Sequence, residues 1–341
     1  MFIRNRWYVA AWDKEVSRKP LARTICGEKV VLFRRGDGSA AALADFCPHR
    51  LAPLSLGTVE GDAIRCGYHG LLVDGAGACL EMPGQEDAPK RLAVATYPIV
   101  ERYRFVWVWI GEEALADPAL IPDFWFCEDP AWAFDGDVYP VACDYRLLVD
   151  NLMDLSHETY VHPSSIGQKE IVDSPIDTRL EGEAVVVERW MKAIDAPPFW
   201  RTFLGKQGLV DRWQICHFAL PSAVTIEVGV APVGTGAPEG DRSQGVEGVV
   251  VNFMTPESPT TCRYYWGMAR SFGVRDAGLT ERMRQSQAGV FDEDVVVLEA
   301  QQRNIDLRPD LKLTTLGIDA GGAHARRLME RAALESARPT A

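Results

Sequence analysis

Short apolar runs separated by turn-forming residues dominate the first 112 positions of the chain. The runs Lys29–Phe33 and Arg104–Ile110 are rich in β-branched and aromatic residues, and Gly36–Gly38 is typical of a turn. No long helical period interrupts them. This pattern predicts a small all-β domain over residues 1–112, followed by a connector over 113–140, where prolines next to aspartates break regular structure.

Helical and strand periods alternate in the remaining residues, 141–341. The helical periods cover Tyr145–Tyr160 and Leu279–Asn304. We expect strands at Ala184–Val187, Ala223–Val230 and Gly248–Met254. The whole chain is therefore predicted to be an α+β protein, with an all-β domain ahead of a mixed domain.

Two segments of the second domain favour irregular structure. Pro232–Glu247 is rich in Gly, Pro and charged residues, so we expect a mobile loop there. The last dozen residues, which end at Ala341, are expected to be disordered.

The composition is that of an ordinary globular protein, with 341 residues, 47% hydrophobic and 25% charged. No run approaches the ~20 apolar residues of a membrane span, and Met1–Trp7 lacks the apolar stretch of a signal peptide. We therefore expect a cytoplasmic protein with reduced cysteines. The formal net charge of −12 argues against nucleic acid and anionic membranes as partners. The cysteines without paired spacing, expected in the core, are Cys26, Cys79, Cys127, Cys143, Cys216 and Cys262.

Two Cys/His couplets carry the first chemical signal. Cys47-Pro48-His49 is separated by sixteen residues from Cys66-Gly67-Tyr68-His69. Two thiolates and two imidazoles at this spacing are typical of a Rieske [2Fe-2S] cluster, in which two histidines replace two cysteines on one iron and raise the potential. A structural zinc site is the alternative, since Cys2His2 also binds zinc. Zinc fingers usually pair Cys with Cys and His with His along the chain, so the mixed couplets favour the cluster.

A second group of metal-binding side chains begins at Asn151. On a helix, Asn151, Asp154 and His157 are three residues apart and share a face. His162 is five residues beyond His157, a spacing that a regular helix would not align. Pro163 is expected to end or distort the helix and turn His162 inward.

Two histidines need a carboxylate to form the facial triad that binds ferrous iron and leaves positions open for O2 and substrate. Asp292, Glu293 and Asp294 are the candidates on the late helix. Asp294 shares a helical face with apolar residues, whereas Asp292 and Glu293 are expected to face solvent. The apolar residues on that face are Val290, Val297 and Leu298.

A pair of hydrogen-bonded core histidines is the alternative for His157 and His162. The Cys/His couplets favour metal binding, because an electron relay needs an acceptor. Asp154, one turn before His157, is either an ordinary helix carboxylate or a residue that orients a ligand histidine and links two metal sites.

These motifs resemble those of the Rieske non-haem iron oxygenases, and specifically the oxygenase components of vanillate O-demethylases. The resemblance extends over nearly the whole chain and includes Phe46–Gly57, Cys66–Leu71, Ala142–Glu170, Asp211–Cys216 and Asp294–Gln302. Leu71 stands where ring-dihydroxylating relatives usually carry Trp, which favours the monooxygenase branch with a single type of subunit.

The resemblance implies a Rieske [2Fe-2S] domain, a helix-grip catalytic domain built from an antiparallel sheet around a long helix, and one mononuclear Fe(II). The implied cluster ligands are Cys47, His49, Cys66 and His69, and the implied iron ligands are His157, His162 and Asp294. Asp154 and Asn151 are the expected catalytic residues. Asp154 is implied to bridge His157 and a cluster histidine of a neighbouring protomer in a head-to-tail homotrimer.

The implied activity is oxidative O-demethylation of vanillate, a methoxylated aromatic acid, to protocatechuate and formaldehyde. O2 is the oxidant, and a separate flavin/[2Fe-2S] reductase delivers electrons from NADH. Another aryl O-demethylase or an aryl-sulfonate methyl monooxygenase is the alternative within the family.

An aromatic acid needs a buried hydrogen-bond donor in its pocket. Asn252 and Gln285 are the candidates for this donor. Gln285 would need a bend in the helix, at Gly289, to lie on the same side as Asp294.

Two other classes of protein would explain only part of the chain. A Rieske ferredoxin would use residues 1–112 and leave the second histidine motif without a role. A helix-grip ligand-binding protein would leave the Cys/His couplets without a role. The iron content separates them, because the oxygenase needs about three irons per chain, the carrier about two and the binder none.

Overall fold

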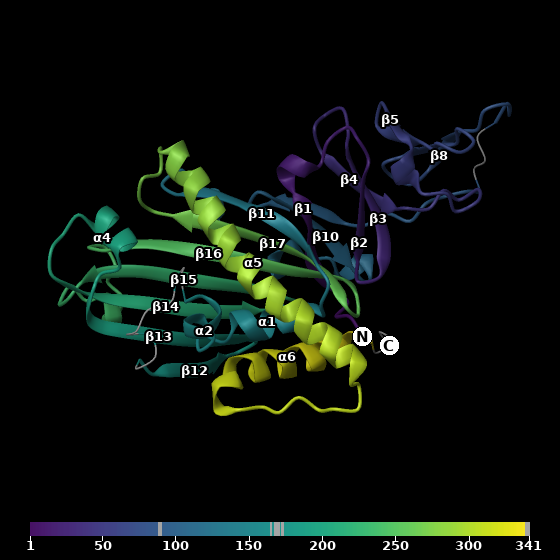
Figure 1. Cartoon of the computed structure of the whole chain (residues 1–341). Coiled ribbons are helices and arrows are strands. Elements are labelled where there is room, and N and C mark those ends of the chain that lie inside the picture. The colour runs from purple at the N-terminus through teal and green to yellow at the C-terminus, as the bar shows by residue number, and fades with distance from the viewer. Residues whose placement is uncertain (88–90, 164–165, 167–170, 172–173, 338–341) are drawn as a thin grey trace. The chain divides into compact units, whose positions relative to one another are not determined.

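The computed structural model describes residues 1–87, 91–163, 166, 171 and 174–337, and these divide into two compact units. The first unit holds Met1–Asp123, Thr255–Ser258 and the described residues from Ser336. The second holds Phe124–Met254 and Pro259–Glu335. Figure 1 labels the elements of both units.

The first unit is built from small antiparallel sheets, as the short apolar runs predict. The strand orders are β1-β10-β9, β2-β3-β4 and β5-β6-β7-β8. The strands are β1 Arg6–Trp12, β2 Leu21–Ile25, β3 Glu28–Arg34, β4 Ala40–Ala44, β5 Thr58–Glu60, β6 Ala63–Arg65, β7 Leu72–Asp74, β8 Cys79–Glu81, β9 Ile99–Arg102 and β10 Phe105–Ile110.

Strand β3 contributes to the core that supports the two cysteine loops of this unit. Successive side chains of a strand point to opposite faces, and β3 is apolar on both. Val30 and Leu32 belong to one buried cluster of hydrophobic residues, while Val31 and Phe33 belong to another. The second cluster also contains Cys47 and Cys66, so the two cysteine loops are seated on a core that the β2-β3-β4 sheet helps to form.

The second unit is a seven-stranded antiparallel sheet in the order β11-β17-β16-β15-β14-β13-β12. The strands are β11 Ala133–Val141, β12 Ile176–Glu181, β13 Ala184–Asp195, β14 Leu209–Ala219, β15 Ala223–Pro232, β16 Val246–Ser258 and β17 Thr261–Arg270. The helices are α1 Tyr145–Leu152, α2 Glu158–Val161, α4 Pro198–Leu204, α5 Ala277–Leu307 and α6 Ala320–Ser336. Helices α1, α2, α5 and α6 lie against one face of the sheet (Figure 1), which is the predicted helix-grip arrangement.

Two glycines allow α6 to approach α1 closely. A Cβ atom on Gly321 would lie 2.5 Å from the carbonyl oxygen of Met153, and one on Gly322 would lie 3.0 Å from Oδ1 of Asp150. A larger residue at Gly321 would therefore push the two helices apart. This contact lies at the end of α1, just ahead of the histidine motif.

The single helix predicted over Tyr145–Tyr160 is wrong. Helix α1 ends at Leu152, and α2 begins only at Glu158. The backbone N–H of Ser156 donates to Oδ1 of Asp154 at 2.7 Å, and this local bond competes with a helical hydrogen bond. As a result, Asn151, Asp154 and His157 do not share the face of one regular helix.

Two further segments differ from the expected pattern. Residues 113–140, predicted as a connector, include strand β11, which pairs with β17 at an edge of the sheet and tolerates Pro140 there. The disorder predicted for the last dozen residues is wrong as far as Ser336, because α6 extends to that residue and buries Met329 and Ala332. Residues 338–341 lie outside the described part of the chain, as do most of the resembling residues 164–170.

Within the described ranges, no helix combines the length and the apolar character that a membrane span needs.

Candidate metal centres

The two Cys/His couplets form two loops with the same backbone pattern. In the first, the N–H of Cys47 donates to the carbonyl of Ala52 at 2.8 Å, and the N–H of Leu51 donates to the carbonyl of Cys47 at 2.8 Å. In the second, Cys66 bonds to Leu71 at 2.8 Å and Gly70 bonds back to Cys66 at 3.0 Å. Each cysteine thus closes its own loop.

Leu51 and Gly70 occupy equivalent positions in these loops, with φ of 58° and 76°. The left-handed conformation is strained for leucine and easy for glycine. The second loop needs glycine for another reason, because a Cβ atom on Gly70 would lie 2.8 Å from Cγ of Pro83. The first loop therefore has a conformation that its sequence alone would not strongly prefer, whereas glycine suits the second.

The loops separate the sulfur donors from the nitrogen donors. The thiols of Cys47 and Cys66 are buried, whereas the rings of His49 and His69 are exposed and lie with their centroids 4.7 Å apart. Burial is the main cause that raises the pKa of the Cys47 thiol, and a bound metal would hold such a sulfur as thiolate. Two sulfurs inside and two nitrogens outside fit a cluster whose irons have different ligands.

The second centre joins His157, His162 and Asp294. One ligand atom from each lies within 4.8 Å of the others. Oδ1 of Asp294 lies 3.2 Å from Nε2 of His162 and 3.5 Å from Nε2 of His157. His162 and Asp294 are almost fully buried, with 1% and 4% of their surface exposed. Two imidazoles and one carboxylate in this arrangement are the donor set of a facial triad for ferrous iron.

The Nδ1 atoms of the two histidines have different partners. Nδ1 of His157 lies 2.6 Å from the backbone oxygen of Asp154, whose carboxylate is more distant at 3.9 Å. Nδ1 of His162 lies 2.6 Å from Oε2 of Glu293. Each bond leaves Nε2 directed toward the carboxylate of Asp294, which is how outer partners orient metal-binding histidines.

Glu293 corrects one sequence prediction. It was expected to face solvent beside Asp292, but its side chain is only 34% exposed and its carboxylate meets His162. The expectation that Asp294 points inward is confirmed, although Val297, placed on the same face, is 48% exposed. Helical periodicity located Asp294 and missed Glu293, because the partner of Glu293 comes from a distant part of the chain.

Asn151 touches the same carboxylate. Its Nδ2 donates to Oδ1 of Asp294 at 3.0 Å, while its Oδ1 is buried and has no hydrogen-bond partner among the described residues. An orphaned buried acceptor is costly. A polar group that enters this centre, such as a water or a hydroxyl, would satisfy it.

The centre has an excess of negative charge that suits a divalent cation. Burial lowers the pKa of His162, but its hydrogen bonds with Asp294 and Glu293 outweigh that effect and raise the pKa overall. The surroundings therefore favour positive charge at this point, which a metal ion supplies in place of a proton.

The two candidate substrate residues lie in different environments. Asn252 is fully buried; its Nδ2 donates to the carbonyl of Val224 at 3.0 Å and its Oδ1 accepts from Tyr264 at 2.6 Å. Tyr264 packs on Phe291 of α5, so Asn252 lies on the helix-covered face of the sheet. Gln285 is exposed and its amide donates to Glu281. Helix α5 continues through this region without interruption, and the structure does not bring Gln285 to Asp294.

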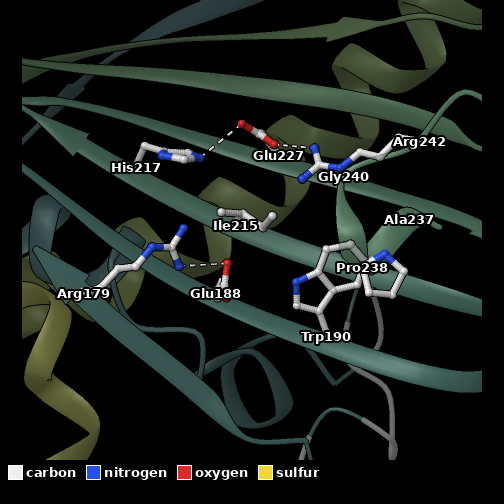
Figure 2. A pocket seen from close by; sticks show the side chains of 10 residues that line it. All are labelled: Arg179, Glu188, Trp190, Ile215, His217, Glu227, Ala237, Pro238, Gly240 and Arg242. Carbon is white, nitrogen blue, oxygen red and sulfur yellow. Dashed lines mark hydrogen bonds and ion pairs between the residues drawn. The ribbon is translucent and has the colours of Figure 1, made fainter. Parts of the chain in front are cut away.

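A cavity of about 260 Å³ opens on the other face of the sheet (Figure 2). Glu188 and Trp190 line it, whereas Arg189 between them points to the helices, because neighbouring strand residues face opposite ways. Its charges are already paired: Arg179 with Glu188 at 2.9 Å, and both His217 and Arg242 with Glu227. We therefore do not assign substrate binding to this cavity.

Comparisons with known proteins match the two domains that carry the candidate metal centres. Residues 6–98 match the Rieske [2Fe-2S] domain, and residues 141–335 match the vanillate O-demethylase oxygenase C-terminal domain. The vanillate O-demethylase oxygenase subunit of Pseudomonas sp. (strain HR199 / DSM 7063) is 51% identical, covering 97% of this chain and 95% of that one. A putative toluene-4-sulfonate monooxygenase iron-sulfur subunit of Comamonas testosteroni is 41% identical, with 97% of each chain covered. The crystal structure of dicamba monooxygenase bound to 3,6-dichlorosalicylic acid superposes with a TM-score of 0.92 at 36% identity, covering 99% of each chain.

A Rieske domain followed by a helix-grip domain with a candidate iron triad defines the class of Rieske non-haem iron oxygenases. This chain belongs to the vanillate O-demethylase oxygenase family of that class. The predicted fold class, family, enzyme class and iron cofactors are confirmed at this level. The role of each individual ligand stays a prediction.

Proposed function

We propose that this chain is the terminal oxygenase component of a vanillate O-demethylase. The reaction consumes vanillate, O2, NADH and a proton, and yields protocatechuate, formaldehyde, water and NAD⁺. A separate flavin/[2Fe-2S] reductase takes the electrons from NADH and passes them to the Rieske domain.

The observation that carries this proposal is the 51% identity with vanillate O-demethylase oxygenase subunits over nearly the full length. The 41% identity with a toluene-4-sulfonate monooxygenase subunit supports a second candidate, an aryl-sulfonate methyl monooxygenase. Both reactions oxidise a methyl carbon attached to, or linked through oxygen to, an aromatic ring that bears an anionic group. Both candidates therefore share one substrate class, an anionic aromatic compound with an oxidisable methyl group.

The proposal assigns both metal centres. Cys47, His49, Cys66 and His69 would hold the cluster, and His157, His162 and Asp294 would hold Fe(II). When bound, the cluster supplies electrons one at a time and the ferrous ion supplies the oxidising chemistry. We assign the first centre to a domain over residues 1–112, and the second to a domain over residues 141–341.

The residues around the triad would position it and the substrate. Asn151 holds Oδ1 of Asp294 through its Nδ2, and its oxygen, which has no hydrogen-bond partner in the described part of the chain, is available to a hydroxyl of water or substrate. Asn252 is the remaining candidate for contact with the aromatic acid, since it is buried on the helix-covered face. If Asn252 has that role, Asn252→Ala will weaken the binding of vanillate; unchanged affinity would remove it from the site.

We extend the proposal to a head-to-tail homotrimer in which Asp154 carries electrons between protomers. The side chain of Asp154 is 20% exposed, and the backbone of the same residue bonds to His157. Asp154 is thus in contact with a candidate iron ligand while its carboxylate reaches the surface of the protomer, as such a bridge requires.

Substrate-dependent NADH oxidation and product analysis, with the purified protein and its reductase, test the function. Formaldehyde release reports O-demethylation, whereas oxidation of the methyl group of toluene-4-sulfonate releases no formaldehyde and is detected as the benzylic alcohol. The substrate panel includes vanillate, other methoxybenzoates and toluene-4-sulfonate. We expect vanillate to give the highest rate, with one protocatechuate formed per formaldehyde. Oxidation of toluene-4-sulfonate in preference to vanillate would favour the second candidate, and oxidation of no member of the panel would overturn both.

A further inference from the structure

Arg189 lies in the middle of β13 with only 1% of its surface exposed. A buried guanidinium is costly unless it is paired and hydrogen-bonded. Neither the reaction nor the metal ligands described above use it. Its position on the helix-covered face of the sheet, next to the histidine motif, therefore needs another explanation.

The guanidinium of Arg189 has a partner in three directions. Nη1 donates to the backbone oxygen of Leu155 at 2.8 Å, Nη2 donates to Oε2 of Glu158 at 3.1 Å, and Nε donates to Oε1 of Gln214 at 3.1 Å. The amide of Gln214 then donates to Oε1 of Glu158 at 2.8 Å. The three side chains form a closed network, and Glu158 and Gln214 are also buried, at 5% and 3%.

This network holds the chain on both sides of His157. Leu155 lies two residues before it, and Glu158 lies directly after it, at the start of α2. Residues 153–156 have left the helix, whereas the carbonyl of His157 already accepts from the N–H groups of Tyr160 and Val161 at 2.9 Å, at the start of α2. The backbone oxygen of Asp154, which orients His157, lies in the non-helical segment before it.

We propose that Arg189, Glu158 and Gln214 form a positioning clamp that holds the His157 segment in the geometry needed for metal binding. The inference rests on the proposed function only in that His157, His162 and Asp294 bind a divalent metal. The clamp touches neither metal nor substrate. It acts through the backbone of Leu155 and through Glu158.

The test is the affinity for Co²⁺, measured by its visible absorption, in cluster-loaded protein whose mononuclear site has been emptied with a chelator. Arg189→Met should weaken Co²⁺ binding about 10–100-fold, the usual effect of removing the outer support of a metal ligand. It should also change the absorption bands, because His157 would no longer be held in place.

Arg270→Met is the matched control. Arg270 is equally buried, at 1%, on a strand of the same sheet, but Nη2 donates to Gly273, Asp276 and Thr280 at the start of α5 rather than to the histidine motif. This variant should lower the thermal unfolding midpoint and leave Co²⁺ affinity unchanged. An equal loss of affinity in both variants would overturn the proposal, because any buried arginine would then have the same effect.

A triple variant, Arg189→Met, Glu158→Leu and Gln214→Leu, separates positioning from stability. Apolar replacement of a whole buried polar network often recovers stability. We expect the unfolding midpoint to recover while Co²⁺ affinity stays low. Wild-type affinity in a folded triple variant would overturn the clamp and leave the proposed function intact, whereas wild-type protein that binds no Co²⁺ would overturn the metal site and the clamp together.

Discussion

The two candidate metal centres are built from the sequence in opposite ways. The candidate cluster ligands come from two short loops, each closed by hydrogen bonds on its own cysteine, with thiols buried and imidazoles exposed. The candidate iron triad comes from a broken helix and a distant long helix, with His162 and Asp294 buried. The first centre depends on local backbone conformation, and the second depends on tertiary packing.

The two centres should therefore be sensitive to different substitutions. The loops of Cys47 and Cys66 need only the core beneath them, whereas the triad needs Glu293 to orient His162 and the packing of α5 to bring Asp294 into place. Changes at one centre should therefore leave the other intact.

Loss of a ligand should empty one centre only. Asp294→Ala should remove one iron per chain and leave about two, with the absorption and paramagnetic signal of the Rieske cluster unchanged. Cys66→Ser should remove the cluster and leave Co²⁺ binding at the triad. Iron analysis and spectroscopy of both variants measure this, and the loss of both centres from either change would contradict their independence.

Asp154→Asn should abolish turnover while both metals stay bound. The substitution keeps the backbone oxygen that orients His157 and removes only the charge proposed to link the centres. Steady-state formaldehyde release and iron content are the two measurements. Asp177→Asn, a change to an exposed carboxylate on β12, is the control and should keep full activity. An active Asp154→Asn variant would remove Asp154 from the electron path.

Glu293→Gln should weaken metal binding at the triad by about 10–100-fold, because the partner that orients His162 loses its charge. Asp292→Asn changes the neighbouring carboxylate, which is exposed, and should leave the affinity unchanged. Competition with a metal chelator gives both values. Equal affinity in the two variants would show that helix α5 alone positions the triad.

The smallest expected effect is on the stability of the protein in acid. It comes from Glu227, which lies on the face of the sheet away from the triad. Burial tends to raise the pKa of Glu227, but contacts with His217 and Arg242 outweigh it and lower the pKa to about 2. A lowered carboxyl pKa contributes stability that is present above its ordinary value, 4.5, and is lost as pH falls toward 2.

Glu227→Gln should therefore destabilise the protein at neutral pH by about 1–2 kcal/mol and reduce the slope of stability against pH below about pH 4.5. Chemical unfolding at several pH values measures this, with Co²⁺ affinity at neutral pH as the control. An unchanged acid slope would mean that the ion pairs of Figure 2 contribute little.

The same contrast explains what could be predicted from the sequence. Cys47, His49, Cys66 and His69 were recognisable because their spacing within two loops is itself the signal. Pro163 correctly marked the end of the helical region, since α2 stops at Val161 and His162 is buried. Asp294 could be chosen over Asp292 by helical period.

Two of the missed features depend on contacts between distant segments, and the third depends on a local bond that competes with the helix. Glu293 was predicted to face solvent because nothing local shows that His162 lies beside it. The break between α1 and α2 follows from a bond of Asp154 to Ser156 that a helical pattern conceals. No sequence pattern singled out Arg189, because only the fold shows that its partners flank His157.

Iron and sulfide analysis of the purified protein, combined with electron paramagnetic resonance of its reduced form, tests the central claim most directly. Two independent centres predict about three irons and two inorganic sulfides per chain, with a Rieske-type signal on reduction. Zinc at the Cys/His couplets, or two irons and an empty triad after loading with ferrous iron, would contradict the account.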